Sequence, residues 1–290
     1  MTILIFIIEY ICDNQKRHKN LNSIENTLNE VLNGDKLFLL AGPCAVENEK
    51  ITLQTAEYLK KVTDKLDIPF VFKSSYRKAN RTNASSFTGI GDDKALKLLG
   101  KVRATFDIPI VTDIHESKEA EIAAEYVDIL QIPAFLFRQT ELLKAAAKTG
   151  RLVNIKKGQF AAAESMKFAA QKVVDSSNPK VLLTERGNMF GYGDMIVDYR
   201  NIVWMKEMGY PVVMDCTHSL QQPNNGSGVT GGLPQLIEPL AKAAVSVGVD
   251  GLFIETHPDP SSALSDGANM LPLHKIENLL NKLLQLRAAL

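Results

Sequence analysis

The chain has 290 residues, of which 45% are hydrophobic and 23% are charged, a composition typical of a globular protein with a sizeable core. Lysine plus arginine and aspartate plus glutamate are equal at 33 each, so no global charge draws the protein to nucleic acid or to an anionic membrane. Three cysteines, Cys12, Cys44 and Cys216, are too few and too scattered for a disulfide framework, which favours a cytoplasmic location.

The amino-terminal stretch is apolar but lacks the features of a targeting segment. Residues 1–12 have no basic residues ahead of the apolar run, are interrupted by Glu9 and contain no small-residue cleavage site. We therefore expect neither a signal peptide nor a membrane span. Residues 1–34 are interpreted as an N-terminal extension, in which the apolar stretch is either an added strand or helix that caps the domain or a poorly ordered tail.

From residue 37 onwards, short apolar runs alternate with helix-like segments. Strands that alternate with helices predict a parallel sheet, and eight strand–helix pairs predict a closed (β/α)8 barrel of the TIM type over residues 35–290. The predicted strands are residues 37–40, 70–72, 108–112, 129–132, 152–155, 181–183, 212–214 and 252–254, and the predicted helices are residues 51–66, 92–106, 117–126, 141–148, 161–174, 198–208, 233–247 and 275–290.

Polar and ionisable side chains follow nearly all of the predicted strands. Examples are Cys44 after the first strand, Lys73 after the second and Asp113 after the third. In barrels of this kind the carboxyl ends of the strands share one face, and that face carries the chemistry. The opposite ends have short turns instead, such as Asp67-Ile-Pro69. We therefore expect the functional site at the carboxyl face.

Two long loops also follow strands. Residues 185–198 contain three glycines, and residues 219–231 read Ser-Leu-Gln-Gln-Pro-Asn-Asn-Gly-Ser-Gly-Val-Thr-Gly. The second composition is typical of a lid that opens and closes over a site, and equally of a disordered loop.

Four possible metal ligands should converge at this face. Closing the barrel brings the eighth strand beside the first, so Cys44, His218 and Glu255 approach one another, and Asp266 in the following loop reaches the same place. One thiolate, one imidazole and two carboxylates suit a divalent transition metal such as Zn, Fe, Mn or Co. Alone, Cys44 and His218 would be read as buried core residues. Cys216 is interpreted as packing in the barrel wall.

Cations form a second group at the same mouth. Lys73, Lys78, Lys156 and Arg186 follow strands two, five and six, and such charges repel one another unless an anion joins them. We therefore expect a substrate with several negative charges.

Other polar side chains add to this group. Gln131, Arg138 and Gln159 offer hydrogen bonds, although Arg138 has the alternative of capping a helix or pairing with Glu141. Asp113 either pairs with a lysine or holds a water. No dinucleotide fingerprint is present, because Gly89-Ile-Gly91 lacks the strand–glycine–helix context, so no nucleotide cofactor is expected.

Ten motifs, matched in order and spacing across residues 37–273, carry a resemblance to a known family. They are Ala41-Gly-Pro-Cys44, Phe72-Lys-Ser-Ser75, Lys78-Ala-Asn-Arg81, Thr112-Asp-Ile-His-Glu116, Gln131-Ile-Pro-Ala-Phe-Leu136, Arg138-Gln-Thr140, Lys156-Lys-Gly-Gln-Phe160, Glu185-Arg-Gly187, Asp215-Cys-Thr-His-Ser219 and Glu255-Thr-His-Pro258. On these motifs the chain resembles the 3-deoxy-D-manno-octulosonate 8-phosphate (KDO-8-phosphate) synthases.

The resemblance implies a cytoplasmic (β/α)8 transferase, usually a homotetramer, that condenses phosphoenolpyruvate with D-arabinose 5-phosphate and releases phosphate. The product leads to the inner sugar of lipopolysaccharide. Lys73, Ser75 and Lys78 would lie near the phosphoenolpyruvate carboxylate, and Lys156, Gln159 and Arg186 around its phosphate. Asn80, Arg81 and Thr82 would hold the aldose phosphate with help from a neighbouring subunit. The catalytic candidates are Lys73, Lys78, Asp113, His218 and Asp266.

The resemblance also implies a class. Metal-dependent members have cysteine at the position of Cys44 and metal-independent members have asparagine there, so this chain resembles the metal-dependent class. A bound metal would either polarise the aldehyde of the aldose or lower the pKa of the attacking water.

Two departures fall in the loop that receives the aldose. Tyr76-Arg77 replaces the usual Phe-Asp, and Asn83-Ala-Ser85 replaces a segment that usually includes histidine. Alternatives are therefore a synthase that makes a nine-carbon product from mannose 6-phosphate, and a non-catalytic phosphosugar-binding barrel that acts as a sensor. Erythrose 4-phosphate, used by the related aromatic-pathway synthases, is disfavoured because Lys78-Ala-Asn-Arg81 replaces their Lys-Pro-Arg loop.

Overall fold

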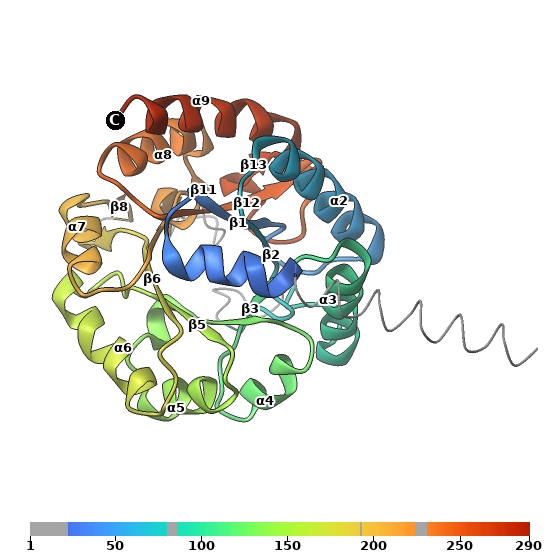
Figure 1. The fold of residues 1–290 in the computed structure, drawn as a ribbon. Coiled ribbons are helices and arrows are strands. Elements are labelled where there is room, and N and C mark those ends of the chain that lie inside the picture. The colour runs from blue at the N-terminus through green and yellow to red at the C-terminus, as the bar shows by residue number, and fades with distance from the viewer. Residues whose placement is uncertain (1–22, 80–85, 192, 224–230) are drawn as a thin grey trace, which may run out of the picture.

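Eight parallel strands form a closed barrel in the computed structural model, which describes residues 23–79, 86–191, 193–223 and 231–290. The barrel closes because β1 pairs with β2 on one side and with β12 on the other. The predicted (β/α)8 fold is confirmed, and Figure 1 shows the barrel along its axis. The strands are β1 (Phe38–Gly42), β2 (Phe70–Lys73), β3 (Ile110–Asp113), β4 (Ile129–Ile132), β5 (Leu152–Lys156), β6 (Val181–Glu185), β9 (Val212–Asp215) and β12 (Gly251–His257).

Helices surround the barrel between consecutive strands (Figure 1). Helix α2 (Glu49–Leu66) shows how the sequence sets helix limits. At its start Asn48 Oδ1 accepts a hydrogen bond of 2.9 Å from the amide of Ile51, and at its end Asp67 takes a left-handed conformation before Pro69. None of the described helices is both long enough and apolar enough to cross a bilayer. The helices are α2 (Glu49–Leu66), α3 (Asp92–Phe106), α4 (Glu119–Ala124), α5 (Thr140–Lys148), α6 (Met166–Val174), α7 (Arg200–Lys206), α8 (Ile237–Ser246) and α9 (Ile276–Ala288).

Side chains that point into the barrel change from apolar to polar along most of the strands. Successive side chains of a strand face opposite sides, so residues two apart share a face. Val111 lies in the apolar interior cluster and Asp113 follows two positions later, and the same step leads from Val213 to Asp215. The amino half of the barrel is therefore filled with apolar side chains, and its carboxyl half presents polar ones. The apolar cluster consists of Val31, Phe38, Leu40, Val71, Val111, Ile129, Leu152, Leu182, Val213 and Phe253.

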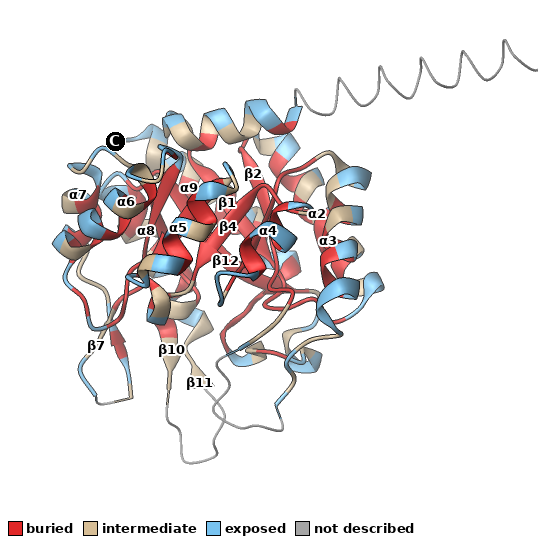
Figure 2. Ribbon diagram, turned by 90° about the horizontal axis from the view of Figure 1, so that it is seen from below, coloured by how far each residue is buried: buried red, intermediate tan, exposed pale blue. Residues whose placement is uncertain are grey.

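A helix over residues 23–33 closes the amino end of the barrel, where sequence reasoning identified only an extension. It lies across the barrel in Figure 1 and at the end opposite the long loops in Figure 2. Val31 is fully buried against the interior cluster, and Leu28 and Leu32 pack beside it. Ile24, Leu28, Val31 and Leu32 follow the spacing of an amphipathic helix, a signal present in the sequence. Residues 1–22 lie outside the described residues.

The long loops contain short strands that the apolar pattern did not predict. In the first, β7 (Asn188–Met189) pairs with β8 (Met195–Ile196), and in the second, β10 (Gln221–Gln222) pairs with β11 (Gly231–Gly232). Residues 224–230, the middle of the proposed lid, lie outside the described residues. After β12, the short strand β13 (Leu271–Pro272) extends the sheet.

Gly42, at the end of β1, permits a close approach of β1 and β2. A Cβ atom built there would lie 2.0 Å from the backbone carbonyl oxygen of Lys73, and backbone cannot move aside as a flexible side chain can. We expect Gly42→Ala to lower the free energy of unfolding by about 1–3 kcal/mol in chemical denaturation. Gly100→Ala in α3 is the control, because its Cβ would meet only the Tyr126 side chain. Equal stabilities of the two variants would contradict the close approach.

Candidate active site

A cavity of about 1240 Å³ opens at the carboxyl face of the barrel. Single-ligand pockets typically enclose about 300–1,000 Å³, so this cavity has room for two small ligands side by side. Its lining includes Lys73, Lys78, Asp113, Gln131, Lys156, Gln159, Arg186, His218 and Asp266, all of which the sequence singled out.

Lys73 connects three strands at the floor of this cavity. Its Nζ donates to Glu255 Oε1 at 2.7 Å, to the backbone carbonyl oxygen of Cys44 at 3.2 Å and to Ser75 Oγ at 3.2 Å. Lys78 Nζ lies 4.0 Å from the same Glu255 oxygen. Burial alone would raise the pKa of Glu255, but Lys73, His218 and Lys78 hold it well below its usual range. The Glu255 carboxylate is therefore ionised.

Lys156 and His218 share the carboxylate of Asp215. Lys156 Nζ donates to Asp215 Oδ2 at 2.6 Å, and His218 Nδ1 lies 2.8 Å from the same oxygen. Because an ionised carboxylate only accepts hydrogen bonds, His218 Nδ1 carries the proton, and its Nε2 faces Glu255 Oε1 at 3.6 Å. Asp215 therefore fixes both the ring orientation and the tautomer of His218.

Of the four cations at the mouth, Arg186 is the one that has no carboxylate partner among the described residues. Its side chain is buried and contacts Gln221 Oε1 at 3.0 Å and Met195 Sδ at 3.6 Å, and no carboxylate of the described residues lies within ion-pair distance. Burial lowers the pKa of its guanidinium, as expected for a charge removed from water. The expectation of four mutually repelling cations needs correction, because Glu255 and Asp215 neutralise Lys73 and Lys156. Arg186 is thus the group most in need of an external anion.

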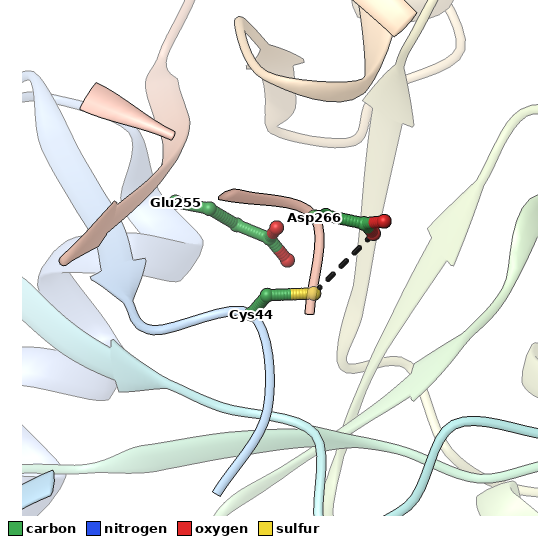
Figure 3. Close-up of side chains that lie close together, drawn as sticks. All are labelled: Cys44, Glu255 and Asp266. Carbon is green, nitrogen blue, oxygen red and sulfur yellow. Dashed lines mark hydrogen bonds between the residues drawn. The ribbon is translucent and has the colours of Figure 1, made fainter. Parts of the chain in front are cut away.

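Cys44, Glu255 and Asp266, the thiol–carboxylate cluster, come together beside the cavity (Figure 3). One potential ligand atom from each lies within 4.8 Å of the others, and Cys44 Sγ lies 3.4 Å from Asp266 Oδ2. His218 is not part of this set, although it adjoins Glu255. Burial and the Glu255 carboxylate raise the pKa of the Cys44 thiol far above its ordinary value. The cluster thus combines a thiol that resists deprotonation with two carboxyl groups.

These donors fit a divalent transition metal. Sulfur, carboxylate oxygen and imidazole nitrogen are borderline ligands of the kind that such ions prefer. Glu255 Oε2 is buried and has no hydrogen-bond partner among the described residues, so a ligand atom is available. The Asp215–His218 pair has the arrangement by which a carboxylate orients a metal-binding imidazole.

Asp113 lies at the end of β3 and is connected to Lys73 through Ser75. Its two oxygens accept hydrogen bonds from Ser75 Oγ and from Gln131 Nε2. Burial would raise the pKa of Asp113, but Lys73, Lys78 and Lys156 lower it well below its usual range. Of the two roles considered for Asp113, a direct ion pair with a lysine is not formed among the described residues, where Lys73 and Lys78 lie next to Glu255 and Lys156 next to Asp215.

The replaced pair Tyr76-Arg77 faces away from the cavity. Tyr76 is buried and its hydroxyl donates to Glu119 Oε2 at 2.7 Å, while Arg77 binds the other Glu119 oxygen and also Asp92 at 3.0 Å. Neither side chain lines the cavity. This departure therefore affects how the loop after β2 is anchored rather than what the cavity contacts. Asn80, Arg81, Thr82 and the segment Asn83-Ala-Ser85 lie outside the described residues.

Tyr76→Phe tests this anchoring. Burial would raise the pKa of Glu119, but hydrogen bonds from His115 and Tyr76 outweigh it and lower that pKa to about 2 from 4.5. The ionised Glu119 carboxylate therefore stabilises the folded state above pH 4.5, and this contribution is lost as the pH falls towards 2. We expect Tyr76→Phe to lower the free energy of unfolding at pH 7 by about 1–2 kcal/mol. Chemical denaturation measures this, with Tyr58→Phe in α2 as the control, and a changed aldose preference would contradict the outward position of Tyr76.

The structure does not bring Arg138 to the cavity. The 3-10 turn Ala134–Leu136 carries the chain outwards after β4, and the exposed Arg138 guanidinium lies 5.7 Å from the ring centroid of Phe160. It lines a separate surface pocket of about 320 Å³ with Phe137, Phe160 and Lys172. No ion pair joins Arg138 to Glu141 in the structure; Glu141 instead contacts Lys144.

Sequence reasoning missed the role of Asp215, which binds both Lys156 and His218. The signal was available: Asp215 lies two positions after Val213, a strand residue that points into the barrel. Strand alternation assigns it to the interior polar layer. By contrast, the neighbouring Cys216 is buried in the outer core, as the prediction of wall packing requires.

Comparison with known proteins agrees with this geometry. The model of the DAHP synthetase I family matches residues 19–290. The chain is 51% identical over 261 residues to 2-dehydro-3-deoxyphosphooctonate aldolase 1 of Arabidopsis thaliana, covering 88% of this chain and 90% of that protein. It is 49% identical over 261 residues to the 2-dehydro-3-deoxyphosphooctonate aldolase of Koribacter versatilis, covering 89% and 94%. The corresponding protein of Brucella canis is 50% identical over 252 residues, covering 87% and 91%. The chain therefore belongs to the DAHP synthetase I family and, within it, to the family of the 2-dehydro-3-deoxyphosphooctonate aldolases.

Proposed function

We propose that the protein condenses phosphoenolpyruvate with D-arabinose 5-phosphate and water to give 3-deoxy-D-manno-octulosonate 8-phosphate and inorganic phosphate. The observation that carries this proposal is the buried Arg186 guanidinium, which lines a two-ligand cavity and has no acidic partner among the described residues. Burying an arginine without a carboxylate partner costs desolvation free energy unless a bound anion pairs with it. The planar guanidinium can donate two parallel hydrogen bonds to a phosphate.

Carbon counting supports arabinose 5-phosphate as the aldose. An octonate has eight carbons, the sum of three from phosphoenolpyruvate and five from a pentose, and this name belongs to relatives about half identical to the chain. Mannose 6-phosphate would give nine carbons and erythrose 4-phosphate seven. The outward position of Tyr76 and Arg77 also removes one motive for preferring mannose 6-phosphate.

The residues of the chain perform the positioning and charge stabilisation. Arg186, Lys156 and Gln159 would hold the phosphate of phosphoenolpyruvate, and Lys73 and Lys78 its carboxylate, so that its C3 carbon faces the aldehyde. Ser75 does not line the cavity and would act through its contacts with Lys73 and Asp113. As C3 attacks the aldehyde, positive charge develops at C2, which then captures water. Fixed cations around the departing phosphate stabilise the charge that it carries away.

The same proposal includes a divalent transition metal held by Cys44, Glu255 and Asp266, with His218 as the fourth ligand. The thiol–carboxylate cluster supports it, since a cation would stabilise the thiolate that burial and Glu255 otherwise disfavour. When bound, the ion would act as a Lewis acid on the aldehyde of the aldose or lower the pKa of water. With such a metal site the protein would belong to the metal-dependent class.

The proposal extends to a homotetrameric assembly in the cytoplasm. Arg138 lies outside the cavity of its own chain and lines a surface pocket, which an interface between subunits would cover. Light scattering of the purified protein measures the assembly, and a monomer with full activity would contradict it.

Product analysis tests the proposed reaction. The purified protein is incubated with phosphoenolpyruvate and, separately, arabinose 5-phosphate, mannose 6-phosphate or erythrose 4-phosphate, and the products are identified by mass spectrometry. We expect the eight-carbon keto acid phosphate. A nine-carbon product alone would establish the mannose 6-phosphate alternative. Saturable binding of substrates with no product after metal is restored would establish the non-catalytic sensor.

A further inference from the structure

A chain of hydrogen bonds runs round the inside of the barrel beneath the cavity, from β6 to the end of β2. Thr184 Oγ1 donates to Asn154 Oδ1 at 2.7 Å, and Asn154 Nδ2 donates to Gln131 Oε1 at 2.9 Å. Gln131 Nε2 then donates to Asp113, which also accepts from Ser75 Oγ. We call Thr184, Asn154, Gln131, Asp113 and Ser75 the interior chain.

The strand register produces this arrangement. Asp113 is paired with Gln131 between β3 and β4, and Gln131 is paired with Asn154 between β4 and β5. Paired residues of neighbouring strands present their side chains on the same side of the sheet at the same level, here towards the barrel axis. All members of the interior chain are buried. Only Asp113 and Gln131 border the cavity, whereas Asn154 and Thr184 do not.

Chemistry at the Asp113 end fixes the direction of the amide hydrogen bonds in the interior chain. Ionised Asp113 accepts only, so Gln131 must turn its amide nitrogen to Asp113 and its oxygen to Asn154. Asn154 must then turn its own nitrogen to Gln131 and its oxygen to Thr184, whose hydroxyl donates. Reversal of either amide would place a carbonyl oxygen against another acceptor inside the barrel, where unmet polar groups are costly.

We propose that Asn154 and Thr184 are positioning residues, which act through Gln131 to hold the Asp113 carboxylate and the Gln131 amide in the orientation that they present to the substrates. This inference rests on the proposed function, since Asp113 and Gln131 face the cavity in which the reaction is placed. Asn154 and Thr184 themselves do not line the cavity in which the substrates would bind. Their effect is on the transition state, because rigidly oriented polar groups stabilise developing charge without reorganising.

Thr184→Val tests the proposal, because valine keeps the shape of threonine and removes only the donor hydroxyl. We expect kcat to fall by about 10–100-fold while the KM for phosphoenolpyruvate changes by less than about threefold, as for an interaction that matters in the transition state. Thr184→Ser, which restores the hydroxyl, should recover kcat to within about threefold of the wild type. Thr63→Val in α2 is the matched control, a buried threonine whose hydroxyl donates to Leu59 within its helix.

The outcomes separate this inference from the proposed function. A wild-type protein without product formation defeats the proposed function and removes the basis of the inference with it. An active wild type whose Thr184→Val variant keeps its kcat overturns the inference alone. The inference is also overturned if Thr184→Ser stays as impaired as Thr184→Val, or if Thr63→Val lowers kcat equally, since packing would then explain the loss. Circular dichroism melting of each variant confirms that folded protein is compared.

Discussion

Replacing Arg186 by methionine is expected to lower kcat/KM by about 10²–10³-fold without loss of stability. Catalysis falls because the guanidinium fork that would hold the phosphate is gone. Stability is kept or rises, because the folded protein no longer buries a cation that lacks a carboxylate partner among the described residues. Steady-state kinetics and chemical denaturation on the same preparation measure both effects.

The matched control is Arg103→Met, where the opposite pattern is expected. The Arg103 guanidinium donates to the buried Asp128 carboxylate at 2.9 and 3.0 Å, far from the cavity lining. Its loss leaves the buried Asp128 carboxylate with the Ile110 amide and with the Arg151 guanidinium, whose Nη1 lies 3.9 Å away, so the free energy of unfolding should fall by about 1–3 kcal/mol while the folded fraction keeps its kcat. An Arg186→Met variant that is destabilised but fully active would contradict the role of Arg186 as an anion site.

Removal of the proposed metal is expected to abolish turnover. Treatment with a strong chelator should stop phosphate release, and return of a divalent transition metal should restore it. Cys44→Ala should be inactive and should retain less metal after dialysis, because the thiol–carboxylate cluster loses its sulfur ligand. Metal content is measured by plasma mass spectrometry together with activity.

Cys216→Ala is the control for Cys44→Ala. Both cysteines are buried, but Cys216 packs in the outer core. We expect its loss to affect stability alone. Full activity of chelated wild-type protein, or of Cys44→Ala, would show that the cluster has no metal-dependent role.

The alternation of apolar runs and helical segments was sufficient to predict the barrel. Each strand carries its own apolar signal, and eight consecutive strand–helix units are typical of a closed parallel barrel. Convergence of Cys44 and Glu255 followed from that closure, since β1 and β12 become neighbours. The capping helix over residues 23–33 was missed although Ile24, Leu28 and Val31 carry a helical spacing, because the surrounding residues are polar.

Side-chain partners were less predictable than strand positions. Order along the chain places Lys73 and Lys156 at one mouth, but only the three-dimensional register shows that Glu255 and Asp215 already neutralise them. Similarly, Arg138 follows a strand as the other site residues do, yet one 3-10 turn takes it out of the cavity. Pattern determines which strand end a residue follows, whereas local turns and competing ion pairs determine where its charged atoms lie.

Phosphate release from phosphoenolpyruvate, followed with and without arabinose 5-phosphate, is the most direct measurement of whether two anionic substrates react in the one cavity. We predict release only when both substrates are present. Release that needs no aldose, or that occurs with mannose 6-phosphate or erythrose 4-phosphate but not with arabinose 5-phosphate, would contradict the proposed reaction.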